Sequence, residues 1–500
     1  MGSFDSLRRK LLKAGAALPS SLLLGCSPAA EPARNLVAEE NRKPGATDWQ
    51  LTRVRLDRSD GYRSPWIEGY CSRQSVKAGE TLQIMVSANP PAPFEVEVFR
   101  MGYYGGRGAR LMASLGPFEA KTQADPPVGE RRLRECRWEP TVELKIPGDW
   151  LSGVYLCRLK RLIKSDSEAP WQSYAIFIVR DEREADILFQ CSDNTWQAYN
   201  RWPDDYSLYT HPRDPSVAGV SVSFDRPYGL YPQIFRNPQS IGSGEFLLWE
   251  YPLCYWLEQH GYDVTYCSNS DMIDSAQPLR AKVFLSVGHD EYWDLRQYDA
   301  ALAAVKEGVT QLYLSGNSVY WVSPFEANTE GRPNRTITRA GPFGEVPDEK
   351  ESRLGPFSVV GPDEGLLMGA RNIDPPNGGG DWIVTKPEHW IFDGTGMEQG
   401  DRIPGLVGWE YHGNPADLPG LEVVAEGIAL HGGVKPAHWT ATIHPGPEGN
   451  FVFNAATIFW AQGLSSPPGH WVPWSHWTRP HGPDERVQRI TRNLLEKALS

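Results

Sequence analysis

A short stretch near the middle of the chain places three side chains capable of acid, base or metal chemistry next to one another. Residues 282–287 form an apolar run rich in β-forming residues, which predicts a buried strand. Gly288 ends the run, and His289, Asp290 and Glu291 follow it directly. Because ligands of open α/β sheets bind at the carboxyl ends of the strands, we expect His289 and Glu291 at such an edge.

The same stretch also has a purely structural interpretation. An amphipathic helical pattern runs from about Asp294 to Glu307. Asp290 would then cap the amino end of this helix, and Glu291 would be a first-turn acid that the helix dipole favours. In this interpretation His289 is a hydrogen-bonded core residue, so this stretch alone leaves both interpretations open.

Two further strands are followed by polar residues, and a nearby loop adds more. The first strand leads into the segment that ends with Tyr199, and another ends at Ser315 and is followed by Asn317. The loop 222–228 contributes Arg226 and Tyr228. Several polar strand ends at one sheet edge indicate a functional site better than any single motif.

The strands and helices that must position these residues fall into two regions. Residues 49–182 contain short alternating strands separated by turns, which predicts an all-β sandwich of immunoglobulin-like type. In residues 184–500 strands alternate with helices, which predicts a doubly wound, mainly parallel α/β sheet. After about residue 380 the sequence becomes rich in strands and loops, until a terminal helix at 483–499. The predicted fold class is therefore α/β plus all-β.

Composition limits the classes of function. The 500 residues carry a net charge of −12 and no basic cluster in the predicted folded region, which argues against binding to nucleic acid. Seven cysteines without a paired CxxC spacing indicate neither a disulfide scaffold nor a zinc site.

The first 26 residues read as an export signal. Arg8 and Arg9 begin a twin-arginine pattern, an apolar stretch follows, and Leu-Leu-Gly before Cys26 is typical of a bacterial lipobox. We expect cleavage before Cys26, lipidation of its thiol and location in the cell envelope or periplasm, with membrane attachment through the lipid anchor only. Residues 27–48 are rich in Ala, Glu, Pro and Asn and are predicted to be a flexible tether.

Three kinds of chemistry were considered for the strand-end residues. The chain has no GxSxG elbow, so a serine nucleophile would have to be Ser315, and Cys191 is the cysteine best placed for thiol chemistry. HExxH and paired-histidine zinc spacings are also missing. A metal held by Glu291 and tyrosine oxygens remains, and such hard anionic donors suit Fe(III) better than Zn(II).

Several strings together resemble the large (β) subunit family of N,N-dimethylformamidase over about residues 55–500. These strings are GYYGGRGAR, NTWQAYN, VSFDRPY, GHDEYW, LSGNSVYW, WIFDGTGMEQGDRIPGLVGWE and RITRNLL. The resemblance implies a sandwich followed by a class I glutamine-amidotransferase-like α/β domain. It also implies a mononuclear iron site formed by two tyrosinates and one glutamate.

The resemblance assigns roles to individual residues. The glutamate ligand corresponds to Glu291, the histidine beside the ligands to His289, and the site asparagine to Asn317. Tyr199 is the first choice and Tyr228 the second for the tyrosinate ligands, and Tyr206 and Tyr209 remain open as alternatives.

The leading hypothesis is an exported, iron-dependent hydrolase of a C–N bond in a small amide, acting by Lewis-acid activation of water. Its partners would be the amide and either further copies of the chain or a small subunit. One alternative is a non-catalytic envelope lipoprotein that binds glycan or another surface component. The other is a metal-free hydrolase that uses Ser315 or Cys191.

Overall fold

The computed structural model describes residues 35–57, 61–162, 169–213, 221–230, 241–339, 354–471 and 481–500. The predicted signal (residues 1–26) and Cys26 lie outside the described residues, so export and lipidation stay predictions. In the described ranges, no helix combines the length and the apolar character that crossing a membrane requires. From Asn35 onward the chain forms one compact unit.

The second part of the segment predicted to be a flexible tether is folded, which corrects that prediction. Helix α1 (Leu36–Asn41) begins after Asn35, whose side chain accepts a hydrogen bond from the Ala38 N–H at 2.8 Å. Val37 is fully buried, and Glu40 pairs with Arg110 at 2.6 Å. Composition suggested a tether because the burial of these few residues depends on distant parts of the chain.

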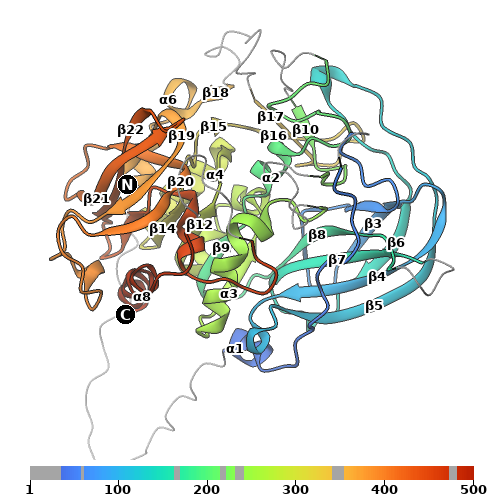
Figure 1. The fold of residues 1–500 in the computed structure, drawn as a ribbon, viewed down its shortest axis with the longest axis horizontal. Coiled ribbons are helices and arrows are strands. Elements are labelled where there is room, and N and C mark those ends of the chain that lie inside the picture. The colour runs from blue at the N-terminus through green and yellow to red at the C-terminus, as the bar shows by residue number, and fades with distance from the viewer. Residues whose placement is uncertain are drawn as a thin grey trace, which may run out of the picture. The chain divides into compact units, whose positions relative to one another are not determined.

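Two facing sheets form the all-β region, drawn in blue to cyan in Figure 1. One sheet has the strand order β1-β3-β6, and the other has the order β2-β8-β7-β4-β5. Apolar side chains of both sheets pack into one core. The strands are β1 (Glu68–Cys71), β2 (Ser75–Lys77), β3 (Thr81–Ser87), β4 (Ala92–Met101), β5 (Ala109–Ala120), β6 (Pro140–Lys145), β7 (Gly153–Arg161) and β8 (Gln172–Arg180).

A nine-stranded mixed sheet follows, with the order β11-β9-β12-β14-β23-β22-β21-β19-β20. The first five strands are mutually parallel, and the remaining neighbours are antiparallel. The predicted α/β plus all-β class is confirmed, with the parallel arrangement limited to five strands. The strands are β9 (Ala185–Gln190), β11 (Val264–Cys267), β12 (Ala281–Gly288), β14 (Thr310–Ser315), β19 (Ala370–Ile383), β20 (Arg402–Pro415), β21 (Glu422–His431), β22 (Lys435–Pro445) and β23 (Phe451–Asn454).

The helix after β12 differs from the sequence prediction at its cap. Asp294, and not Asp290, caps this helix, because its carboxylate accepts a hydrogen bond from the Arg296 N–H at 2.8 Å. Another helical segment starts as a π-helix at Phe246, and Gly261, with a φ of 72°, lies just beyond its end. The helices are α2 (Asp193–Tyr199), η4 (Phe246–Glu250), α3 (Tyr251–Gln259), α4 (Leu295–Lys306), α6 (Phe357–Val360), α7 (Gly365–Met368) and α8 (Glu485–Leu499).

Short elements connect these layers. They include two small sheets with the orders β10-β17-β16 and β13-β15-β18. Their strands are β10 (Ser221–Ser223), β13 (Tyr292–Trp293), β15 (Trp321–Val322), β16 (Phe325–Glu326), β17 (Thr336–Thr338) and β18 (Gly355–Pro356). The 3₁₀ helices are η1 (Tyr104–Gly106), η2 (Glu130–Arg132), η5 (Asn269–Ile273), η6 (Pro278–Arg280), η7 (Trp390–Phe392) and η8 (Ile458–Gly463).

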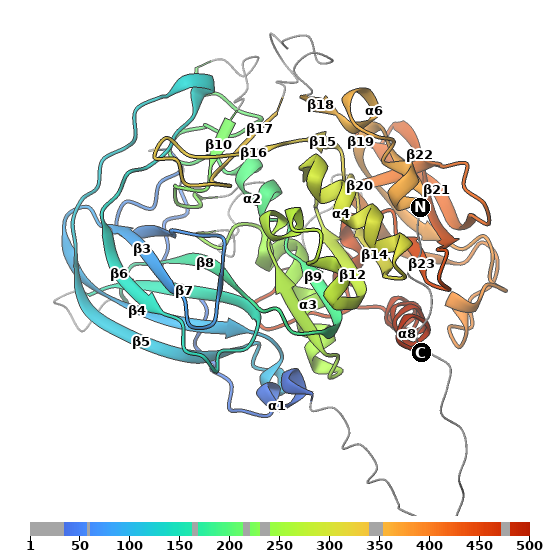
Figure 2. The ribbon, with the colours of Figure 1, turned by 180° about the vertical axis from the view of Figure 1, so that it is seen from behind.

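The register of the parallel strands brings their following segments to one edge. Ser286 of β12 lies opposite Gln190 at the end of β9, and Gly288 lies opposite Ser315 at the end of β14. Figure 2, seen from behind, shows β9, β12 and β14 side by side between the sandwich and the antiparallel strands. The backbone after β14 also packs closely on β20, because a Cβ at Gly316 would lie 2.3 Å from the Glu410 carbonyl oxygen.

Candidate metal centre and active site

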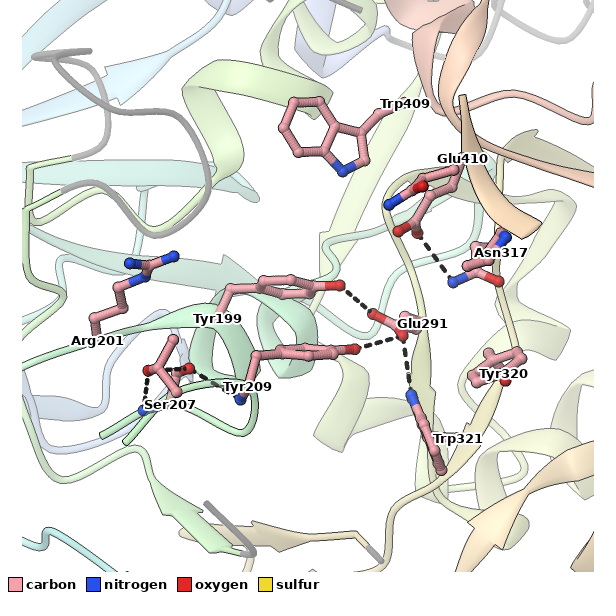
Figure 3. A pocket seen from close by; sticks show the side chains of 13 residues that line it. Tyr199, Arg201, Ser207, Tyr209, Glu291, Asn317, Tyr320, Trp321, Trp409 and Glu410 are labelled. Atoms are coloured by element: carbon pink, nitrogen blue, oxygen red, sulfur yellow. Dashed lines mark hydrogen bonds between the residues drawn. The ribbon is translucent and has the colours of Figure 1, made fainter. Parts of the chain in front are cut away.

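Glu291 lies at the centre of a converging set of hydrogen-bond donors. The Tyr199 hydroxyl donates to its carboxylate at 3.0 Å, and the Tyr209 hydroxyl donates at 2.6 Å. The Trp321 indole N–H donates at 3.0 Å to the same oxygen that Tyr209 contacts. Figure 3 shows both phenol rings pointing their oxygens toward Glu291. Both phenols thus donate hydrogen bonds to the same buried carboxylate.

A second carboxylate approaches this point from the antiparallel half of the sheet. His289 Nε2 lies 2.7 Å from Glu410 and 3.2 Å from Glu291, so the imidazole bridges the two acids. The Asn317 side-chain amide donates to Glu410 at 3.0 Å. These four side chains are all buried.

The mutual charges of these groups set their protonation. Burial alone would lower the pKa of His289, but Glu410 and Glu291 outweigh burial and hold that pKa well above its usual value. Desolvation raises the pKa of Glu291, yet the hydrogen bond and charge of His289 reverse this effect and leave the pKa lowered. Burial raises the pKa of Glu410. These directions favour an ionised Glu291 and a protonated His289 that faces both acids.

A buried arginine backs the tyrosine rings. The Arg339 guanidinium lies 4.2 Å from the centre of the Tyr209 ring and 4.6 Å from that of Trp321. Burial and the charge of Glu291 raise the pKa of Tyr209 well above its usual value, and the charge of Arg339 opposes this rise. The Tyr292 hydroxyl also donates a hydrogen bond to the Tyr209 hydroxyl. Arg339 thus places a positive charge against the face of a phenol that points at Glu291.

The turn that carries Asn317 is strained and tightly held. Asn317 and Val319 have φ angles of 51° and 53°, a conformation that is rare for a β-branched residue. The Ser318 N–H donates to His412 Nε2 at 2.8 Å, and His412 Nδ1 lies 2.9 Å from the Asn454 side-chain oxygen. Burial lowers the pKa of His412 to about 4, which keeps Nε2 free of a proton and able to accept.

Glu291 and the two phenols beside it line a cavity of about 410 Å³. Its wall combines aromatic, small polar and charged side chains. The lining residues are Tyr199, Arg201, Ser207, Tyr209, Thr210, Glu291, Asn317, Tyr320, Trp321, Pro376, Asn377, Trp409 and Glu410.

The structure brings Tyr199, His289, Glu291 and Asn317 together. It does not bring Tyr228 to this point, because the loop after β10 turns its ring against Trp196, with ring centroids 6.3 Å apart. Tyr228 instead lines a separate cavity of about 30 Å³.

The two tyrosines left open as alternatives separate clearly. The Tyr206 ring lies under the Arg134 guanidinium at 4.6 Å, and Tyr206 does not line the larger cavity. Tyr209 lies beside Glu291, to which its hydroxyl donates a hydrogen bond. The sequence analysis therefore included Tyr209 among its candidates but preferred Tyr228.

Three residues of the site were not found by sequence reasoning. Glu410 and His412 lie on β20, a strand of the region described only as β- and loop-rich, and Arg339 follows β17. Two signals could have found Glu410. It ends the string WIFDGTGMEQGDRIPGLVGWE of the family resemblance, and its alternation with His412 along one strand places both side chains on the same face.

The two nucleophile candidates fit a structural role. Cys191 is fully buried, and this burial raises the pKa of its thiol well above the usual value, which disfavours the reactive thiolate. Ser315 is also buried and accepts a hydrogen bond from the Ser318 hydroxyl at 2.6 Å. Neither residue lines the 410 Å³ cavity.

The donor set fits a metal ion in two overlapping ways. Tyr199, Tyr209 and Glu291 supply three oxygen atoms of the kind that a hard trivalent ion prefers. His289, Glu291 and Glu410 also have potential ligand atoms that all lie within 4.8 Å of one another. Both sets contain Glu291.

The chain belongs to the N,N-dimethylformamidase beta subunit-like family, whose C-terminal model matches residues 95–474. The predicted family membership is thereby confirmed. The N,N-dimethylformamidase beta subunit of Paracoccus aminophilus is 26% identical over 451 residues, covering 73% of this chain and 55% of the relative. The subunit of the same name from an Alcaligenes species is 24% identical over 227 residues, covering 38% of this chain and 28% of the relative.

The chain spans about half the length of the Paracoccus relative and a smaller share of the Alcaligenes one. Among solved structures, a superoxide reductase (neelaredoxin) from Ignicoccus hospitalis aligns with 24% of this chain and 82% of its own, at 16% identity. Its TM-score of 0.14 is too low to carry an argument about the fold.

Proposed function

We propose that this protein is an iron-dependent hydrolase of carboxamide C–N bonds, with its reaction centre at Glu291. The observation that carries the proposal is the convergence of the Tyr199 and Tyr209 hydroxyls on the Glu291 carboxylate. Membership of the N,N-dimethylformamidase beta subunit-like family supports the reaction class. Tyr199, Tyr209 and Glu291 would hold the ion, with Tyr209 in the place that the sequence reasoning gave to Tyr228.

A trivalent iron bound there would act as a Lewis acid that polarises a carbonyl and acidifies water. The chain's own residues supply proton transfer. His289 Nε2 lies 2.7 Å from a Glu410 oxygen, a distance over which a proton can be transferred. In the reaction this pair accepts a proton from water and returns one to the departing amine.

Asn317 positions polar atoms at the cavity wall. One side-chain N–H donates to Glu410, and the other N–H can donate to the amide carbonyl oxygen. A donor that meets developing charge on this oxygen is often worth about 2.7–4 kcal/mol in a reaction barrier. The strained turn held by His412 fixes the direction of this donor.

We further propose that the chain is exported by the twin-arginine signal and anchored by a lipid at Cys26. Further copies of the chain or a small subunit would be its protein partners. The immunoglobulin-like and glutamine-amidotransferase-like fold assignments also stay predictions. They rest on the signal sequence and on the family resemblance.

Elemental analysis of the purified protein, with a visible spectrum of the same sample, tests the proposal. We expect about one iron per chain and a broad tyrosinate-to-iron absorption band. Glu291→Ala should lose both the metal and the hydrolysis of amides. A colourless protein without stoichiometric iron, even after reconstitution, would overturn the proposal, and full iron in Glu291→Ala would exclude that ligand.

A matched pair of tyrosine variants separates the two ligand assignments. Tyr209→Phe should weaken and shift the visible band, because its oxygen points at Glu291 and Tyr199 would be the one tyrosinate left. Tyr228→Phe should keep both the band and the iron content, because this ring packs on Trp196. The opposite result would restore the assignment that sequence reasoning preferred.

A further inference from the structure

The cavity beside Glu291 is much larger than the smallest amides require. Its volume is about 410 Å³, whereas one water-sized group occupies about 30 Å³. An amide that carries only hydrogen or methyl groups would leave most of this space filled with water. Cavities of this volume are typical of sites that enclose substantially larger organic ligands.

Aromatic rings line the cavity around the reaction centre. In Figure 3, Trp409 lies on one side of Glu291, and Tyr320 and Trp321 lie on the other side. Trp409 packs on Trp249 with ring centroids 5.9 Å apart, and Tyr320 packs on Trp321 at 4.9 Å. These contacts hold the rings in place, so the cavity presents aromatic surface on both sides of the reaction centre that suits a flat apolar group.

The charges of the wall disfavour an acidic substrate. Glu291 and Glu410 lie where the amide group would bind, and a further carboxylate there would meet like charge. Arg201 is the one basic residue among the described lining residues. Its guanidinium already donates to the Tyr62 hydroxyl at 3.1 Å and lies 3.5 Å from Asp205.

We propose that the substrate is an uncharged carboxamide with an aromatic or similarly large apolar substituent on the amide. The amide group would lie against Glu291 and Asn317, and the substituent would lie against the aromatic wall that includes Trp409 and Tyr320. Water adds to the amide carbon, the C–N bond breaks, and the products are a carboxylic acid and an amine. This inference rests on the proposed hydrolysis, but binding of the ring can be tested separately.

The test compares N-benzylacetamide with N-methylacetamide on the iron-loaded protein, because the two leaving amines have similar basicity. We expect kcat/KM to be at least about tenfold higher for N-benzylacetamide, which retains the alkyl amide and adds the ring. Trp409→Ala should bring the ratio close to one, and Tyr320→Ala provides a second test should the first variant fold poorly. Trp471→Ala, a change at a side chain that is 60% exposed and outside the cavity, should keep the wild-type ratio.

Each outcome decides one question. Equal kcat/KM for the two amides would overturn the proposed substrate class and leave the hydrolase assignment intact. If neither amide is hydrolysed but N-benzylacetamide changes tryptophan fluorescence in wild type and not in Trp409→Ala, the ligand class stands and hydrolysis fails. N-acetylphenylglycine, which adds a carboxylate beside the amide of N-benzylacetamide, should react more slowly, and equal rates would overturn the requirement for an uncharged substrate.

Discussion

The sandwich core and the cavity edge of the large sheet are both buried, but different side chains fill them. Between the sandwich sheets lie apolar residues such as Leu82, Val96 and Phe177, each at most 1% exposed. Around the cavity edge, Asp193 and Glu245 are buried carboxyl groups, and burial raises the pKa of each to about 8. One region hides apolar surface, and the other hides groups that water would solvate better.

Backbone conformation shows the same contrast. Asn317, Val319 and Ala456, which follow β14 and β23, have positive φ angles although none is a glycine. Such conformations and buried acids are costly, so other parts of the molecule must offset them. Burial of apolar surface in the sandwich is one source of that stability. The comparison therefore predicts that stability and chemistry can be changed separately.

The largest expected effect on stability is in the sandwich core. Phe177→Ala removes a ring that is 1% exposed and stacks on Tyr155 at 5.3 Å, so we expect a loss of about 3–5 kcal/mol in the free energy of unfolding. Urea denaturation measures this loss, and Val434→Ala, at a side chain that is 81% exposed, is the matched control. Iron content of the folded fraction should not change. If it falls in proportion to stability, the two regions are not independent.

A smaller effect, on turnover, is expected at His412. His412→Phe removes the acceptor for the Ser318 N–H, so Asn317 should lose its orientation and kcat should fall by about 10–100-fold with little change in KM. His412→Gln restores an acceptor at a similar position and should recover part of the rate. Steady-state kinetics of both variants, with circular dichroism as the folding control, provide the measurement. Equal losses in both variants would indicate general disruption of the turn.

The smallest effect concerns pH. Because the pKa of Asp193 is raised to about 8, the folded chain keeps a proton that the unfolded chain releases near pH 4. This contribution to stability is complete at low pH and is lost as the pH rises through 8. The free energy of unfolding should therefore fall between pH 6.5 and 8, and Asp193→Asn should reduce this fall by on the order of 1 kcal/mol. Melting temperatures measured across this pH range would show a shallower slope for the variant. Glu245 titrates in the same range, so part of the fall should remain, and an unchanged slope would contradict the assignment.

Local patterns predicted the parts of the site that follow the parallel strands. β12 extends one residue beyond its predicted bounds at each end, β14 ends at Ser315 as predicted, and His289, Glu291 and Asn317 follow strand ends that share one edge. Such runs are long, apolar and bounded by glycine, so their periodicity is informative.

Glu410, His412 and the choice between Tyr209 and Tyr228 depend on tertiary contacts. β20 reaches the site because β23 pairs with β14 and the antiparallel strands continue the sheet beyond it. No local spacing encodes this pairing. Likewise, both tyrosines lie in loops with similar composition, and only the packing of the Tyr228 ring on Trp196 removes it from the cavity.

The pairing of β14 with β23 also determines when the site can form during synthesis. β14 (residues 310–315) can pair with β23 only after residues 451–454 have been synthesised, and β19 to β22 lie between them in the sequence. Contacts between such distant segments form slowly, because a long loop must close first. The growing chain therefore contains Glu291 well before Glu410 and Asn454 are added, and we expect the cavity to assemble late in folding.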